Sequence, residues 1–407
     1  MKFVILVGDG MGDEPMDELN GKTVLEAAAT PAMDSLCRRG ELLLTRTVPA
    51  GFPPGSDVAN LSLLGYEPEK YYTGRAPLEA ASMGIRLAAD EIAYRCNLVT
   101  LEHRGDQVIM RDYSAGHITT EESRRLIRDL RRSCPDDNFR LYPGVSFRHL
   151  LVSGKKESGP VTTPPHDHLD QDVTGYYNNY LSAPGFRELI TASEKLLANH
   201  PVNRARQRDG KNPANALWLW GEGRMPSMPP FSKRYGMEGG LISAVDLLKG
   251  IGVCCGLDIC EVEGATGYLD TNYGGKVEAA LAALDRRDFV LVHVEAPDEA
   301  GHQGSLADKL RAVEDFDRCI VGPVVAGLKK RYQPFRLLVT MDHYTPLAIR
   351  THVDWPVPML LFDSRGAGPA CGLVYSERNA VEYSRHHNRR FDSGADYFSF
   401  FLEKRER

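Results

Sequence analysis

The sequence has no long apolar stretch. None of its segments approaches the roughly 20 apolar residues that a membrane-spanning helix requires. The first apolar run, Phe3–Val7, ends at Gly8-Asp9-Gly10 and is too short for the apolar region of a secretion signal. We therefore expect no membrane partner, and the cytoplasm is the default location.

An excess of positive charge is also absent. The 49 lysines and arginines are outnumbered by 55 aspartates and glutamates, which gives a formal net charge of −6. Proteins that bind nucleic acid usually carry a basic surface, so nucleic acid is not expected as a partner. If the substrate is an anion, local clusters of arginine and lysine must bind it.

The cysteines contain no C-x-x-C pair. Their spacing fits neither a zinc knuckle nor a disulfide framework, and two of them are adjacent. We expect reduced thiols, as is usual in a reducing compartment. The eight positions are Cys37, Cys96, Cys134, Cys254, Cys255, Cys260, Cys319 and Cys371.

What the sequence does contain is an alternation of apolar strand patterns with helical patterns. Phe3–Val7 is a continuous apolar run, as in a strand buried on both faces, and similar runs follow much later in the chain. Helical patterns lie between them; one begins at Thr30-Pro31 and stops at Gly40. This alternation predicts a doubly wound α/β sheet. The later runs are Phe289–Val294, Arg336–Thr340 and Val357–Phe362.

The middle of the chain has a different character. Residues 86–235 hold shorter strand-like pieces, proline-rich connections and one clear helical pattern around Leu189–Leu197. We interpret this segment as a smaller α+β cap domain. It would be inserted into a discontinuous α/β core made of residues 1–85 and 236–407.

Acidic residues and histidines follow several of the predicted core strands, and one further histidine, His352, comes shortly before the last of them. In an open α/β sheet, ligands bind beyond the carboxyl ends of the strands, so these side chains should meet in one region. Mixed oxygen and nitrogen donors suit manganese, zinc or magnesium. Each residue alone also fits a turn or a helix cap, and only their joint placement favours metal ions. The residues are Asp9, Asp298, His302, Asp342, His343 and His352.

Ser56 is the candidate nucleophile. It follows Pro53-Pro54-Gly55 and precedes a helix-like run from Val58 to Leu64. A serine at this position could simply cap the helix. The alternative is a metal-bound alkoxide, because coordination to a metal is one of the few ways to ionise a serine hydroxyl near neutral pH.

Several polar side chains are candidates for binding the substrate. The cationic ones are Arg75, Arg148, Arg224 and Lys276. Most such side chains are solvated surface charges, so none of them is strong on its own. His166-Asp167-His168, which follows two prolines, fits a proton relay, a metal site or a turn.

Taken together, these segments resemble the cofactor-independent phosphoglycerate mutases, most closely the archaeal-type branch, within the alkaline phosphatase superfamily. The resemblance runs over nearly the whole chain. It rests on VGDGMGDEP, TPAMDSL, PPGSDVANLSLLGY, YYTGRAPLEAASMGI, GATGYLDTNYGGK, EAPDEAGHQG, TMDHYTP and THVDWPVPML.

The resemblance implies an isomerase of glycolysis that exchanges 2- and 3-phosphoglycerate through a phosphoserine at Ser56. It implies an alkaline-phosphatase-like core, a cap that holds the glycerate, and a monomer or homo-oligomer that needs no bisphosphoglycerate. It also implies two divalent ions, with Mn²⁺ expected ahead of Zn²⁺ or Mg²⁺. One would be held by Asp9, Ser56, Asp342 and His343, and the other by Asp298, His302 and His352.

One position departs from the pattern of the family. Trp220 stands where phosphoglycerate mutases of this type usually have an arginine on the substrate side. Arg224, four residues on, is a candidate to supply the missing charge. The departure leaves open a related metal-dependent phosphotransferase, such as a homoserine kinase-like enzyme, or a phosphatase.

Overall fold

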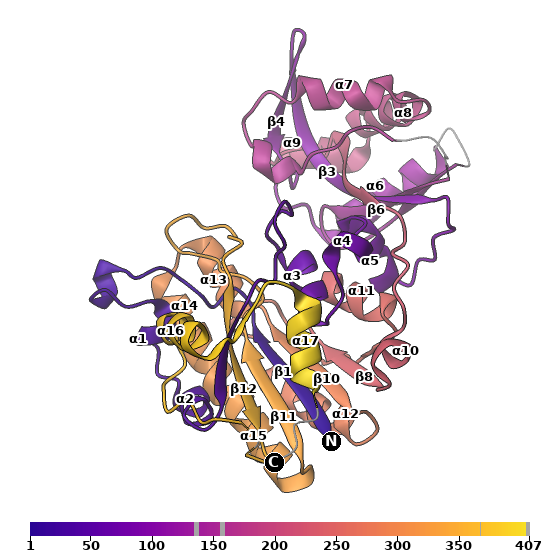
Figure 1. Cartoon of the computed structure of the whole chain (residues 1–407). Coiled ribbons are helices and arrows are strands. Elements are labelled where there is room, and N and C mark those ends of the chain that lie inside the picture. Colours follow the sequence, from indigo (N-terminus) through magenta and orange to yellow (C-terminus); the bar gives the residue numbers. More distant parts are fainter. Residues whose placement is uncertain (134–137, 155–158, 367, 404–407) are drawn as a thin grey trace. The chain divides into compact units, whose positions relative to one another are not determined.

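A computed structural model describes residues 1–133, 138–154, 159–366 and 368–403 (Figure 1). The chain divides into two compact units. The core unit comprises Met1–Tyr72 and Ser227–Arg407, and the inserted unit comprises Thr73–Pro226. The sequence placed the insertion at residues 86–235. In the structure, helix α5 (Arg75–Ser82) belongs to the inserted unit and helix α10 (Phe231–Tyr235) to the core unit.

The core unit is built on an eight-stranded sheet with the order β13-β2-β12-β11-β1-β10-β8-β9. The four apolar runs predicted as strands are all strands, and those in the centre of the sheet are buried throughout. The strands are β1 (Lys2–Gly8), β2 (Glu41–Thr45), β8 (Gly239–Ile242), β9 (Asp258–Ile259), β10 (Phe289–Val294), β11 (Phe335–Thr340), β12 (Val357–Asp363) and β13 (Arg390–Phe391).

Strand direction explains how one edge of this sheet collects polar residues. Strands β8, β10, β1 and β11 are adjacent and parallel to one another, so their carboxyl ends share an edge. Strand β12 is antiparallel to both β11 and β2, which makes the sheet mixed. Because of this reversal, β12 begins at the edge where β11 ends. The loop that joins them therefore stays at that edge.

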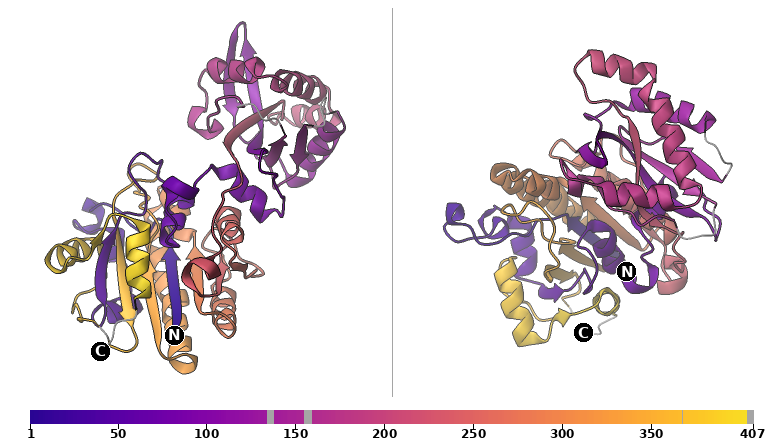
Figure 2. Two further views of the ribbon diagram at one scale, coloured as in Figure 1. Left: turned by 45° about the vertical axis from the view of Figure 1, so that its right-hand side comes forward. Right: turned by 90° about the horizontal axis from the view of Figure 1, so that it is seen from above.

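Helices cover both faces of the core sheet (Figures 1 and 2). Two of these helices, α14 (Leu306–Phe316) and α15 (Gly322–Arg331), are joined by a π-helical turn at Asp317–Val321. Of the helices in the described parts of the chain, none could cross a membrane. The others of this unit include α1 (Val24–Ala27), α2 (Pro31–Cys37), α3 (Ser56–Leu63), α4 (Pro68–Tyr71), α11 (Asp246–Cys254), α12 (Tyr273–Leu284), α13 (Ala296–Gln303), α16 (Glu377–His387) and α17 (Gly394–Leu402).

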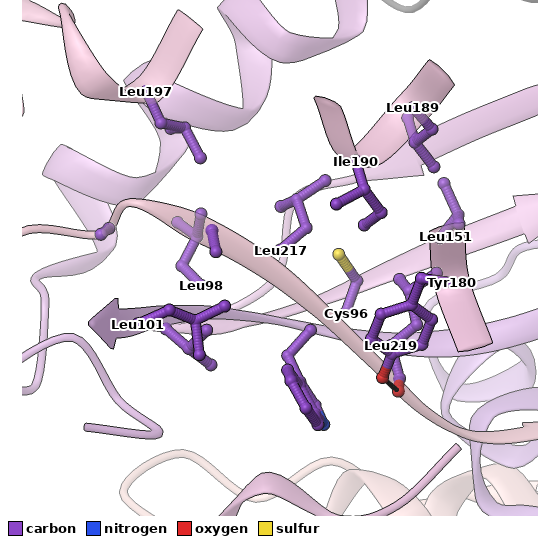
Figure 3. Packing of buried hydrophobic residues seen from close by; sticks show 14 of the residues in the cluster. Cys96, Leu98, Leu101, Leu151, Tyr180, Leu189, Ile190, Leu197, Leu217 and Leu219 are labelled. Carbon is purple, nitrogen blue, oxygen red and sulfur yellow. Dashed lines mark hydrogen bonds between the residues drawn. The ribbon is translucent and has the colours of Figure 1, made fainter. Parts of the chain in front are cut away.

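The inserted unit has its own sheet and its own core. Strand β3 (Ile92–Arg104) pairs with β4 (Gln107–Asp112), β6 (Arg148–Ser153) and β7 (Ala216–Gly223), and β5 (Phe139–Tyr142) pairs with β6. Apolar side chains of β3 and β7 pack against helices α7 and α8 (Figure 3). The predicted α+β character of this segment is thus confirmed. Its helices are α5, α6 (Thr120–Arg132), α7 (Thr174–Ser182), α8 (Phe186–Ala198) and α9 (Pro201–Arg208).

The cysteines of the described residues are free thiols, in keeping with the expectation from their spacing. The sulfur atoms of Cys37 and Cys371 are 3.6 Å apart. Cys134 lies outside the described residues.

Candidate active site

In the core unit, the predicted residues lie at the ends of strands β1, β10 and β11 and at the start of helix α3. Asp9 directly follows β1, and Asp342 lies two residues beyond the end of β11. Asp298 is in the first turn of α13, which begins just after β10. All three carboxylates are buried. The three carboxylates therefore follow the ends of neighbouring strands of the same sheet.

The Ser56 hydroxyl lies beside this cluster. Ser56 is the first residue of α3, and its Oγ is 3.1 Å from Nε2 of His343. The same His343 nitrogen is 3.4 Å from Oδ1 of Asp9 and 3.7 Å from Oδ2 of Asp342. One hydroxyl, one imidazole and two carboxylates thus share a small volume.

A second group of donors surrounds Asp298. Its Oδ2 is 3.2 Å from Nε2 of His302, which is four residues further along α13, and its Oδ1 is 3.4 Å from Nε2 of His352. The two histidine Nε2 atoms are 2.9 Å apart. Thr345 donates a hydrogen bond from its hydroxyl to Oδ1 of Asp298. The i, i+4 spacing read from the sequence therefore does place both side chains at one point.

The electrostatics of the cluster are those of a site built for cations. Burial raises the pKa of Asp9 well above its usual range, and the charges of Asp342 and Asp298 raise it further. Burial would also raise the pKa of Asp298, but hydrogen bonds with His302 and His352 outweigh it and hold the pKa well below normal. Burial lowers the pKa of His302, but the Asp298 carboxylate outweighs this effect and raises the pKa to about 9.

These residues fit metal ions. Among the described residues, two sets have ligand atoms within 4.8 Å of one another: Asp9 with Asp342 and His343, and Asp298 with His343 and His352. Oδ1 of Asp9 is buried and has no hydrogen-bond partner in the described parts of the chain. Buried carboxylates without such partners are costly unless a cation compensates them. His343 belongs to both sets, whereas the family resemblance assigned it to one.

Asn60 contacts both Ser56 and Asp342, and this role is not evident from the sequence. It lies one turn after Ser56 in α3, and its Nδ2 donates both to the Ser56 carbonyl and to Oδ2 of Asp342, each at 2.9 Å. Backbone N–H groups of Gly10 and His343 donate to Oδ1 of the same aspartate. The orientation of Asp342 is therefore fixed from several directions.

His293 is a further residue that the sequence analysis missed. It lies near the end of β10 and is fully buried, with Nε2 3.1 Å from Oδ2 of Asp9. Burial lowers the pKa of His293 to about 4, so its imidazole is neutral near pH 7. The only signal in the sequence is a single polar residue inside an otherwise apolar strand.

A buried lysine holds two of the site loops. Lys309, in α14, donates from Nζ to the carbonyls of Gly12 and Thr345 at 2.9 and 2.8 Å and pairs with Asp13 at 2.8 Å. Gly12 and Asp13 follow Asp9, and Thr345 follows His343. This ammonium therefore ties the loop after β1 to the loop after β11.

In the inserted unit, an arginine that contacts Trp220 lies near two other arginines. The Arg95 guanidinium lies 4.0 Å above the Trp220 ring and pairs with Glu79 at 3.1 Å. Burial, and then the charges of Arg75 and Arg148, lower the pKa of Arg95 to about 10 against the opposing effect of Glu79. Arg75 and Arg148 were predicted from the sequence, whereas Arg95, which lies within an apolar strand, was not.

The other predicted substrate residues are placed differently. The His166 ring packs edge-on against Trp220 at 5.3 Å, and Asp167 next to it is exposed. Arg224 is exposed, and its Nη1 donates to the carbonyl of Ala89 at 3.3 Å. Lys276 is fully buried in the core unit, where Nζ donates to the carbonyl of His293 at 2.9 Å.

The fold and the site together define a class: an α/β enzyme in which a serine hydroxyl lies beside a buried aspartate–histidine cluster fit for metal ions. Comparison with known proteins agrees with this class. The profile of the 2,3-bisphosphoglycerate-independent phosphoglycerate mutases matches residues 37–203.

Two relatives resemble the chain over most of their length. A probable 2,3-bisphosphoglycerate-independent phosphoglycerate mutase of Geobacter sulfurreducens is 52% identical over 93% of this chain and 95% of its own. The corresponding Methanosarcina mazei protein is 53% identical over 89% and 90%. A solved cofactor-independent phosphoglycerate mutase from Thermoplasma acidophilum superposes with a TM-score of 0.65 at 25% identity, covering 99% of each chain. The chain belongs to the 2,3-bisphosphoglycerate-independent phosphoglycerate mutase family.

Proposed function

We propose that this enzyme interconverts 2- and 3-phosphoglycerate by passing the phosphoryl group through Ser56. The observation that supports this most directly is the position of the Ser56 hydroxyl, 3.1 Å from His343 and beside the buried aspartates. A serine at the start of a helix also benefits from the positive end of the helix dipole, which favours a developing negative charge. We infer the substrate from the relatives, which are named phosphoglycerate mutases.

We assign two divalent ions to the cluster, with Mn²⁺ favoured by the mixed oxygen and nitrogen donors. Asp9, Ser56, Asp342 and His343 would hold one ion, and Asp298, His302 and His352 the other. When bound, such ions supply Lewis acidity that favours the ionised serine and neutralises phosphoryl charge. The protein contributes the positions of the donors: Asn60 and Lys309 hold the loops, and Thr345 fixes Asp298.

The cationic cluster of the inserted unit is the proposed binding site for the anionic groups of the substrate. The charges of Arg75 and Arg148 both act on Arg95, and the three arginines outnumber Glu79, the carboxylate that pairs with Arg75 and Arg95. Guanidinium groups bind carboxylate and phosphate through paired hydrogen bonds. Arg95, stacked on Trp220, is well placed to supply the charge that an arginine at position 220 would bring. We retain His166, Asp167, Arg224 and Lys276 as further candidates.

The reaction is tested with the purified, Mn²⁺-loaded enzyme and 3-phosphoglycerate, with no bisphosphoglycerate added. We expect formation of 2-phosphoglycerate, and we expect Ser56→Ala to abolish turnover while keeping the fold and the metal content. Mass spectrometry of trapped enzyme should find phosphate on the peptide that contains Ser56. Release of free phosphate, or activity only with ATP and another acceptor, would refute the mutase reaction.

We further propose a cytoplasmic location and a monomer or homo-oligomer. The location is supported by the free thiols among the described cysteines, which suit a reducing compartment. Cell fractionation tests the location, and light scattering at several protein concentrations tests the oligomeric state.

A further inference from the structure

The His293 imidazole lacks hydrogen-bond partners. Its side chain is completely buried, and neither Nδ1 nor Nε2 makes a hydrogen bond within the described residues. A buried polar group of this kind normally costs stability, so it calls for a ligand or a partner. His293 lies in β10. This strand pairs with β1, which precedes Asp9, and it leads into α13, which contains Asp298.

The free Nε2 faces two carboxylates of the candidate metal site. It is 3.1 Å from Oδ2 of Asp9 and 4.0 Å from Oδ2 of Asp342. On the other side, Oδ1 of Asp9 is 3.4 Å from Nε2 of His343. The Asp9 carboxylate therefore lies between two imidazole nitrogens, one of which belongs to the proposed ligands and one of which does not.

The backbone around His293 favours this orientation of the imidazole. The carbonyl of His293 accepts a hydrogen bond from the buried ammonium of Lys276 at 2.9 Å, which fixes the backbone at this point of β10. Strand pairing places His293 opposite Val7, two residues before Asp9. The strand register therefore directs the imidazole toward the Asp9 side of the site.

We propose that His293 is an additional nitrogen ligand of the ion held by Asp9 and Asp342. This inference rests on the proposed metal site and deepens it. The set of donors for that ion becomes two imidazole nitrogens, two carboxylates and the Ser56 hydroxyl. Imidazole is a preferred ligand of transition metals, whereas magnesium favours oxygen, so the second nitrogen selects Mn²⁺ or Zn²⁺ over Mg²⁺.

The test counts coordinated histidines in the wild-type, full-length protein. The protein is labelled with ¹⁵N-histidine, loaded with ¹¹³Cd²⁺ in place of the native metal, and examined for scalar coupling between cadmium and ring nitrogens. We expect four coupled histidines: His293, His302, His343 and His352. His293→Gln should remove one set of couplings and leave the others.

Metal affinity provides a second measurement. Titration of metal-free protein with Mn²⁺ should give two binding events, and His293→Gln should weaken one of them by at least tenfold, the scale seen when metal-supporting groups are lost. The control is His149→Asn, which alters another buried histidine, in the inserted unit, and should leave both events unchanged.

The outcomes separate the inference from the proposed function. Only three coupled histidines in an active mutase would overturn the role of His293 and leave the reaction standing. Absence of bound cadmium would overturn the metal site and this inference together. The wild-type spectrum decides the question even if His293→Gln does not fold.

Discussion

At the scale of single residues, Asp342 depends on Asn60 for its orientation. The Asn60 amide is the side-chain donor to Oδ2 of this carboxylate, and it also holds the carbonyl of Ser56. Asn60→Ala should therefore lower kcat by about 10- to 100-fold, as loss of groups that orient metal ligands typically does. Steady-state kinetics with 3-phosphoglycerate, and Mn²⁺ titration of the same variant, measure the effect.

A matched control is available in the inserted unit. Asn203 is also buried, and its Nδ2 donates to two carbonyls, those of Leu197 and Ala214. Asn203→Ala should lower stability to a similar extent but leave kcat nearly unchanged. If both variants lose activity in proportion to their lost stability, Asn60 has no specific part in the site.

A second residue-scale prediction concerns His149. Burial lowers its pKa to about 3, and its Nδ1 accepts a hydrogen bond from the N–H of Gly144 at 3.0 Å. The unfolded chain binds a proton near the usual pKa of about 6.5, whereas the folded chain does not. The part of the unfolding free energy that depends on neutral His149 is therefore fully present above pH 6.5. It is lost as the pH falls toward 3.

The expected loss between pH 6.5 and pH 4.5 is roughly 2–3 kcal/mol, because each pH unit in this window is worth about 1.4 kcal/mol. His149→Asn keeps an acceptor near the position of Nδ1 but cannot be protonated, so its stability should fall less steeply. Hydrogen exchange of the peptides of β3 and β6 at several pH values measures the difference. Equal pH dependence in the two proteins would contradict the prediction.

The sequence predicted some residues of the site and not others, for a physical reason. Asp9, Asp342 and His343 follow apolar strands directly, so the rule that ligands bind at strand ends was enough to group them. His293 and Arg95 lie inside strands, where the pattern gives no sign of which face a polar side chain occupies or what it meets. Asn60 was missed because its importance comes from two contacts that only the folded chain creates.

At the scale of elements, α14 stabilises the site through Lys309. Its fully buried ammonium links the loop after β1 to the loop after β11 and neutralises Asp13. Lys309→Met would leave that carboxylate buried and unpaired with a cation. Breaking a buried ion pair from one side typically costs about 3–5 kcal/mol. We expect the unfolding temperature of the core unit to fall by on the order of 10 °C, as measured by calorimetry.

A double variant separates the charge from the packing. Asp13→Asn combined with Lys309→Met removes both charges and should recover part of the lost stability. The control Lys249→Met removes a partly exposed lysine, paired with Glu261 on the surface, and should change little. No recovery in the double variant would mean that the charge of Asp13 is not the cause of the loss.

Elements were predicted better than their connections. The central strands were evident because strands buried on both faces are apolar throughout. The reversed direction of β12 was not predicted, since an apolar run has the same appearance in both directions. The π-helical turn at Asp317–Val321 was also missed, because apolar spacing continues across it from Val313 to Val324.

At the scale of the whole molecule, the described residues form separate hydrophobic clusters in the two units, and the candidate metal ligands lie together in one unit. The core of the inserted unit, built from β3, β7 and helices α7 and α8, contains none of the proposed metal ligands. All eight of those ligands, with His293 counted among them, belong to the core unit. Metal binding and the stability of the inserted unit should therefore be independent of each other.

Metal removal tests this independence in the intact protein. A ligand that binds only the folded state stabilises it by about 2.7 kcal/mol at a concentration 100 times its dissociation constant. Treatment with a chelator should therefore speed hydrogen exchange by on the order of 100-fold in β1, β10, β11 and the loops that follow them. Hydrogen exchange in β3, β6 and β7 should stay the same, because the inserted unit contains no proposed metal ligand and gains no stability from metal binding. Re-addition of Mn²⁺ should restore protection in the core unit alone. Equal loss of protection in both units would show that they unfold together. No change in either unit would show that the candidate site binds no metal ion that stabilises the fold.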